Sequence, residues 1–172
     1  PEAIREFELV LASDPMNEDA LLWLCLCHLH LGLSIDAHPL IEWLVRKDPL
    51  NSIIRILPGL RFYYRGELEH ALESLEKAYQ SDQSDPLILW HYGRLLASAN
   101  HTDRAIAALD KCVKMGRFVI TRFSQLLSLA LQNKKQDVVN SIDPDLEYWA
   151  KKDWLASLWL AECLSLVGED EK

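Results

Sequence analysis

The sequence predicts an all-α protein: about ten helices stacked as antiparallel pairs in an α-solenoid. Three observations predict this fold class. First, Ala3, Ala37, Ala71 and Ala105 are spaced 34 residues apart, and so are the turn positions Gly32, Gly66, Asn100, Lys134 and Gly168. Second, each period holds two stretches with apolar residues at helical spacing. Third, six Gly and seven Pro in 172 residues are too few for a turn-rich β-sandwich or barrel.

The helices of the first three periods follow one plan. Leu21–Leu31 is strongly apolar, and Gly32 behind it suits the left-handed conformation that ends a helix. Ser34–Arg46 comes next and stops at Asp48-Pro49, because the residue before a proline avoids the helical region. The same pattern predicts helices at Ile53–Tyr64, Leu68–Ser81, Pro86–Ser98 and Asp103–Lys114. Short turns between them favour antiparallel neighbours.

The fourth period departs from this plan. Lys134 replaces the turn glycine, and Asp143-Pro144 falls where the second helix of the pair should continue. Since a proline in a helix interior costs about 3 kcal/mol, we expect a helix at Lys135–Ile142, a break, and a new helix at Asp145–Lys151. Pro58 lies midway in a first helix, and we expect a kink there.

The stretch Gly59–Ala78 resembles a tetratricopeptide repeat, as do Gly93–Cys112 and Ala3–Pro15. This resemblance implies a right-handed superhelix that presents a concave groove to protein partners. The register gives one array over 1–172: a half repeat at 1–17, full repeats at 18–51, 52–85, 86–119 and 120–153, and a half repeat at 154–172. We expect the chain to be a fragment of a longer protein.

Composition narrows the classes of partner. The chain has 18 Lys and Arg against 26 Asp and Glu, a net charge of −8, which disfavours nucleic acid and anionic membranes. Its longest apolar run, Leu21–Leu33, is too short to span a bilayer. Four cysteines, two of them inside that run, do not form a disulfide framework. We therefore predict a cytoplasmic protein with a protein or peptide partner and no cofactor.

The family pattern implies which side chains line the groove. The positions are Leu22, Leu26, Ile56, Leu60, Tyr63, Tyr64, Trp90 and Arg94. Members that bind chaperone tails carry a clamp of Lys, Asn and Arg there, and this chain has apolar residues instead. The groove therefore suits an apolar peptide or amphipathic helix, with Arg94 and Glu162 orienting it. Two alternatives stay open: these side chains are core, or they mediate self-association.

Catalytic and metal sites are not indicated. Cys25 and Cys27 lie near His28 and His30, but neighbours two apart on a helix point away from each other, and structural zinc needs about four ligands. We interpret them as buried side chains. No nucleophile motif is recognisable, so we predict no enzymatic activity for the fragment. The segment Asp143–Gly168 is similar to repeat tails of bacterial signalling enzymes with a kinase or cyclase domain, which gives a further alternative, a regulatory tail.

Overall fold

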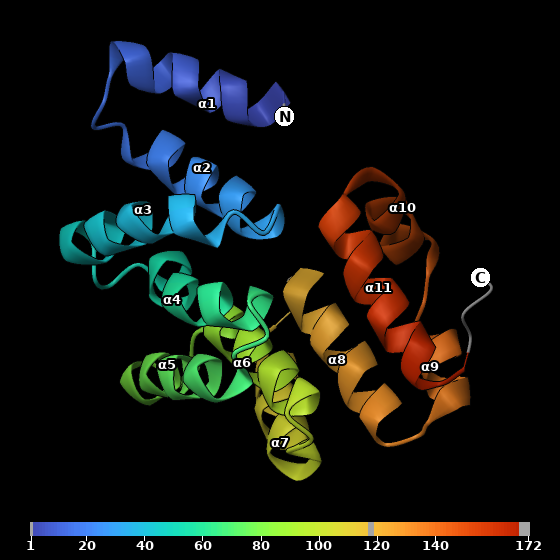
Figure 1. Cartoon of the computed structure of the whole chain (residues 1–172). Coiled ribbons are helices and arrows are strands. Elements are labelled where there is room, and N and C mark those ends of the chain that lie inside the picture. The colour runs from blue at the N-terminus through green and yellow to red at the C-terminus, as the bar shows by residue number, and fades with distance from the viewer. Residues whose placement is uncertain (1, 117–118, 169–172) are drawn as a thin grey trace. The chain divides into compact units, whose positions relative to one another are not determined.

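The computed structural model describes residues 2–116 and 119–168, and this part of the chain contains eleven helices and no strand (Figure 1). The all-α prediction is therefore confirmed. The chain divides into two compact units: unit 1 is residues 1–82, and unit 2 is residues 83–172.

Unit 1 holds five helices in consecutive contact. They are α1 (Glu2–Ser13), α2 (Glu18–His30), α3 (Ser34–Lys47), α4 (Ser52–Tyr64) and α5 (Leu68–Ser81). The helices α2 and α3 form one pair, and α4 and α5 form the next. The first helices of the two pairs, α2 and α4, also pack against each other. Helix α4 continues through Pro58 as a single helix.

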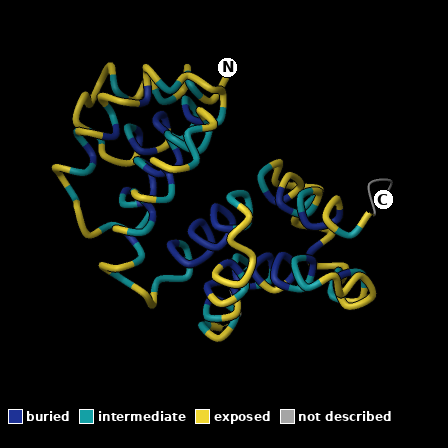
Figure 2. The backbone as a smooth tube through the Cα atoms, turned by 60° about the horizontal axis from the view of Figure 1, so that its bottom comes forward, coloured by how far each residue is buried: buried dark blue, intermediate teal, exposed yellow. Residues whose placement is uncertain are grey.

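Unit 2 holds six helices. They are α6 (Pro86–Ser98), α7 (Thr102–Val113), α8 (Val119–Leu131), α9 (Lys135–Asn140), α10 (Pro144–Lys152) and α11 (Trp154–Leu166). Helix α8 packs against α6, α7 and α11, so it lies at the centre of the unit. Buried residues are numerous in this half of the chain, and α6 alone has nine of them. Figure 2 colours each residue of the chain by its burial.

Four first helices, α2, α4, α6 and α11, begin at a side-chain cap, and successive caps lie 34 or 68 residues apart. Asn17, Asn51, Asp85 and Asp153 each accept a hydrogen bond from a backbone N–H two or three residues further on, at 2.8 to 3.1 Å. Such a cap stabilises a helix by about 1 kcal/mol because it satisfies a donor that has no partner inside the helix. This series is a signal of the repeat that the sequence analysis missed.

The turns inside the pairs contain a residue in the left-handed backbone conformation. The sequence analysis expected this at Gly32 and Gly66, which both have φ of 75°. Asn100 has φ of 62° at the third turn. At the fourth turn the left-handed residue is Asn133, with φ of 55°, rather than Lys134. Asn tolerates this conformation better than Lys, since its short side chain bonds locally to the backbone. The turn therefore shifts by one residue.

The break in the fourth period is confirmed. Helix α9 ends at Asn140, two residues before the predicted end, and α10 begins at Pro144. Proline suits the first turn of a helix, where its missing N–H has no partner to lose. Asp143 caps α10 by accepting a hydrogen bond from the N–H of Leu146 at 2.9 Å. Because the second helix of this period is split in two, the count over the described residues rises from ten helices to eleven.

Candidate functional site

The structure divides the eight predicted groove residues into two groups. Five are buried and three are half-buried. The buried residues are Leu22, Ile56, Leu60, Trp90 and Arg94, and the half-buried ones are Leu26, Tyr63 and Tyr64. A buried side chain has little surface to offer a partner, which favours the open alternative that the five are core. The three half-buried residues all lie in unit 1.

In unit 1 the half-buried residues gather on the last turns of α2 and α4. We call Leu26, His30, Tyr63 and Tyr64 the α2–α4 aromatic face. The His30 and Tyr64 rings meet edge to face with centroids 5.4 Å apart, and the Tyr63 and Tyr64 rings meet with centroids 5.6 Å apart. Such ring pairs contribute about 0.5–1.5 kcal/mol beyond their buried area. The face is therefore held in a defined arrangement before any partner binds.

In unit 2 the predicted groove residues Trp90 and Arg94 are buried. We call Trp90, Arg94, Phe123, Trp159 and Glu162 the α6–α11 cluster. The Trp90 and Trp159 rings lie 5.1 Å apart, and Phe123 lies 5.3 Å from Trp159 and 6.3 Å from Trp90. Trp90 is fully buried, and Trp159 is 9% exposed. Helix α11 thus covers the aromatic side chain that the sequence analysis assigned to a partner.

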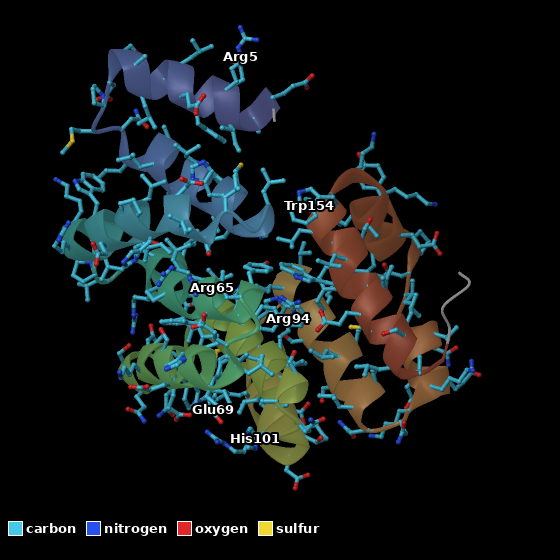
Figure 3. The ribbon with its side chains drawn as sticks, viewed as in Figure 1. Arg5, Arg65, Glu69, Arg94, His101 and Trp154 are labelled. Carbon is cyan, nitrogen blue, oxygen red and sulfur yellow. The ribbon has the colours of Figure 1, made fainter. Side chains whose placement is uncertain are left out.

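Arg94 and Glu162 form an ion pair inside this cluster (Figure 3). The Nε and Nη2 atoms of Arg94 donate to Oε2 of Glu162 at 3.0 and 2.8 Å. The guanidinium carbon also lies 5.5 Å from the ring centroid of Trp90 and 5.9 Å from that of Trp159. The side chains are 7% and 27% exposed, so the pair is screened less than a surface pair. These two charges orient α11 on α6.

Small side chains on α8 allow α6 and α11 to meet. Helix α8 lies between them, and its buried Thr121, Ser124 and Ser128 are spaced by three and four residues, on one face. The Ser124 hydroxyl donates to the carbonyl of Ile120 at 2.9 Å, and that of Ser128 donates to Asp110 at 2.6 Å. The polar atoms are therefore satisfied locally, while Phe123 of the same helix packs against both Trp90 and Trp159.

The 34-residue register could have predicted the ion pair between Arg94 and Glu162. Leu26, Leu60, Arg94, Ser128 and Glu162 occupy one position in successive repeats, 34 residues apart. Opposite charges two repeats apart, with serine between them, are consistent with a contact across the middle helix. The sequence analysis placed Arg94 and Glu162 in the groove but assigned both to a partner.

Unit 2 also has an open cleft of about 780 Å³ on its surface, between α9, α10 and α11. We call it the α9–α11 cleft. Its apolar lining comes from Val139, Ile142, Ala150, Leu160, Ala161 and Leu164. Glu147 and Lys151 also line it and form an ion pair at 3.6 Å. The sequence analysis did not predict this cleft.

The four cysteines are thiols of differing burial, and Cys27 is only half-buried. All four are free, and Cys25, Cys112 and Cys163 are buried. Burial raises the pKa of the Cys25 and Cys163 thiols to about 12, since the thiolate would lose its hydration. The described residues contain no group of three His, Cys, Asp or Glu side chains placed to hold a metal ion. Cys25 and Cys27 therefore carry no metal-site proposal.

Over the described residues, no helix is both long enough and apolar enough to cross a bilayer.

Known proteins support the fold. Residues 56–118 match the family model of the tetratricopeptide repeat. A search of curated proteins gives no match. Among solved structures, the chain is similar to TTC0263, a thermophilic tetratricopeptide repeat protein of Thermus thermophilus. The TM-score is 0.72 at 21% identity, over 94% of this chain and 89% of that one.

Two further structures agree. One is a tetratricopeptide repeat protein from Parabacteroides merdae, with a TM-score of 0.58 at 15% identity, over 96% of this chain and 66% of that one. The other is MamA, with a TM-score of 0.53 at 20% identity, over 95% of this chain and 85% of that one. At these identities the likeness shows the fold, a tetratricopeptide-type helical solenoid, and the predicted family resemblance is confirmed.

Proposed function

We propose that this chain, a helical solenoid of tetratricopeptide type, is a non-catalytic scaffold that binds a protein partner on the α2–α4 aromatic face. One observation carries the proposal: Leu26, Tyr63 and Tyr64 are the predicted groove residues that keep part of their surface exposed. The other five are buried. Tyrosine is enriched among the residues that dominate binding energy at interfaces, because it buries a large area at a small cost in conformational entropy.

The chemistry of the face favours an apolar peptide or the apolar side of an amphipathic helix. Two tyrosine rings and Leu26 offer apolar area, and the tyrosine hydroxyl groups allow a few polar contacts. Helix-in-groove recognition uses apolar anchors of this kind. Unit 1 carries seven Lys and Arg against fourteen Asp and Glu over residues 1–82, a net charge of −7. A partner with basic residues beside its apolar anchors would therefore associate faster at low salt.

The test is a binding measurement with peptides selected from a random library on the whole chain. The informative variant is Tyr63→Ala combined with Tyr64→Ala, measured by calorimetric titration against the selected peptides. We expect Kd to rise about tenfold or more, as for truncation of interface anchors. Circular dichroism checks that the variant keeps its helices.

Tyr79→Ala is the matched control, because Tyr79 is also half-buried in unit 1 but lies on α5. It should leave Kd unchanged. If the double variant binds the peptides as tightly as the unmodified chain, the proposed face is wrong.

A further inference from the structure

The turn between α2 and α3 carries exposed apolar side chains where the later repeats carry polar ones. Leu31 is 55% exposed, Leu33 is 41% exposed and Ile35 is 80% exposed. We call these three residues the α2–α3 apolar turn. The residues at the position of Ile35 in the next three repeats are Glu69, Asp103 and Asp137. Those at the position of Leu33 are Glu67, His101 and Lys135. The apolar character is therefore particular to this turn.

The position of Ile35 faces solvent even in repeats that have a neighbour on each side, because Glu69, Asp103 and Asp137 are all exposed. A repeat stacked against the first pair would therefore leave Ile35 in water, and its side chain adds little to the core. Single exposed apolar residues are common on protein surfaces. Three of them within five residues form a patch of the kind that marks an interaction site.

The turn holds these side chains in a fixed arrangement. Gly32 has φ of 75°, and its N–H donates to the carbonyl of Leu29 at 3.1 Å. The N–H of Leu33 donates to the carbonyl of His28 at 2.8 Å. The carbonyl of Leu33 accepts from the N–H of Ala37 at 3.1 Å. These bonds end α2 and begin α3, so a partner loses little conformational entropy in ordering the turn.

The turn adjoins the α2–α4 aromatic face. His30, at the end of α2, meets the ring of Tyr64 with centroids 5.4 Å apart. The carbonyl of Ser34, the residue before Ile35, accepts a hydrogen bond from Nε of Arg61 at 3.3 Å. Both contacts reach the last turns of α4, which carry the tyrosines of the face. The apolar turn and the aromatic face are therefore parts of one surface.

We propose that the helix bound on the α2–α4 aromatic face continues over the α2–α3 apolar turn and places a further apolar side chain against Ile35. This inference rests on the function proposed above and specifies more of the partner. The four residues of the face are half-buried, so the more exposed turn adds a large apolar area to a small site. Leu26 and Leu31 lie about 7.5 Å apart along α2, and a partner helix of about three turns, roughly 16 Å, reaches both parts.

The charges beside the turn favour a basic side chain at that end of the partner helix. Asp36 is exposed directly after Ile35. Arg65, at the end of α4, forms an ion pair with Glu67 at 2.6 Å, so its charge is largely balanced. A Lys or Arg beside the apolar anchor of the partner would meet Asp36, in agreement with the net charge of −7 on unit 1.

The experiment extends the calorimetric titration of the selected peptides to variants of the turn. Ile35→Gln replaces an exposed apolar side chain by a neutral polar one, so the variant should fold. We expect Kd to rise about tenfold, as for the loss of an interface anchor. Asp36→Asn should raise Kd about threefold at low salt and leave it unchanged at about 1 M salt, where charges are screened beyond about 3 Å.

Leu50→Gln is the matched control, because Leu50 is 82% exposed in the loop after α3. It should leave Kd unchanged, and Ile35→Leu should keep the affinity. The inference is overturned, and the proposed function stands, if Tyr63→Ala with Tyr64→Ala weakens binding and Ile35→Gln does not. It is also overturned if Leu50→Gln weakens binding as much as Ile35→Gln.

Two further outcomes separate the inference from the proposed function. If the tyrosine variant binds as tightly as the unmodified chain, the proposed face is wrong and the inference fails with it, whatever Ile35→Gln does. Sedimentation velocity on the unmodified chain and on Ile35→Gln tests a different occupant. Self-association that Ile35→Gln abolishes would assign the turn to a second copy of the chain and overturn the inference.

Discussion

Units 1 and 2 place different chemistry on the first helices of their pairs. In unit 1, α2 and α4 end in Leu26, Tyr63 and Tyr64, which remain partly exposed. In unit 2, Trp90 and Arg94 are covered by Trp159 and Glu162 of α11. Position in the repeat accounts for part of this difference, because Ile56, one repeat before Trp90, is also buried, and Ser98, one repeat after Tyr64, is half-buried. In unit 2, Trp159 and Glu162 of α11 add long-range contacts to Trp90 and Arg94.

The largest expected effect on stability comes from truncating one aromatic side chain in each unit and comparing the two costs. Trp90→Ala should lower the free energy of unfolding by about 3–5 kcal/mol, because it leaves a cavity in a fully buried cluster. Tyr64→Ala should cost under about 2 kcal/mol, since part of that ring is already in water. Urea denaturation followed by circular dichroism measures both. Equal costs would contradict the division into core and surface.

The ion pair that orients α11 is tested by a double-mutant cycle. Arg94→Met and Glu162→Met should each lower the free energy of unfolding by about 2 kcal/mol, because each leaves a charge without its partner in a partly buried place. The combined variant should cost less than the two single costs together, by about 1 kcal/mol or more. Additive costs would show that the two side chains stabilise unit 2 independently.

Substitutions at the close contacts between paired helices should have the same effect on stability in both units. Gly59→Ala and Gly93→Ala should each destabilise by about 1–3 kcal/mol, since the new methyl group meets Leu75 or Leu109. Elsewhere in a helix interior the same change stabilises by about 1 kcal/mol. Thermal unfolding gives the sign. Gly59→Ala in a Leu75→Ala background is the control, where the clash and therefore the added cost of alanine should disappear.

The smallest expected effect is on stability at low pH. It comes from Asp143 at the break of the fourth repeat, a feature that unit 1 lacks. The hydrogen bond from Arg122, and next the one from the N–H of Leu146, lower the pKa of Asp143 below its ordinary value of 3.8. A lowered pKa means that the contribution to stability is complete above the ordinary value and is lost as the pH falls through the lowered one.

NMR titration of the Asp143 carboxyl should give a midpoint below 3.8. Asp143→Asn should keep the cap of α10 and remove this part of the acid dependence, because asparagine caps helices as well as aspartate does. A titration midpoint at or above the ordinary value would contradict the Arg122 contact.

The periodic features of this fold could be predicted from sequence, and the contacts between repeats could not. Helices, turns and the break at Pro144 follow from local rules, so they were placed within three residues of their positions in the structure. The prediction for the fourth turn was wrong by one residue. The left-handed residue is Asn133 rather than Lys134, because Asn adopts that backbone conformation more readily than Lys. Pro58 lies inside α4, which continues as one helix on both sides of it.

The candidate site depended on long-range packing, which the pattern along the chain does not encode. Trp90 and Tyr64 both have large aromatic side chains on first helices of a pair, at different positions of the repeat. Trp90 also packs against Trp159 of α11, a residue 69 positions further along the chain. The α9–α11 cleft was missed for a similar reason, since it exists only where the split helices α9 and α10 meet α11.

The ion pair between Arg94 and Glu162 also bears on how the two units fold. Solenoids mostly make contacts between sequence neighbours, so folding can start anywhere and spread. Joining residues 68 positions apart adds a loop-closure cost that must be met before the contact forms. Unit 1 has helix pairs in contact with their nearest neighbours and can form while the chain is still being synthesised. Unit 2 must wait for α11, so it should fold later and in a single step.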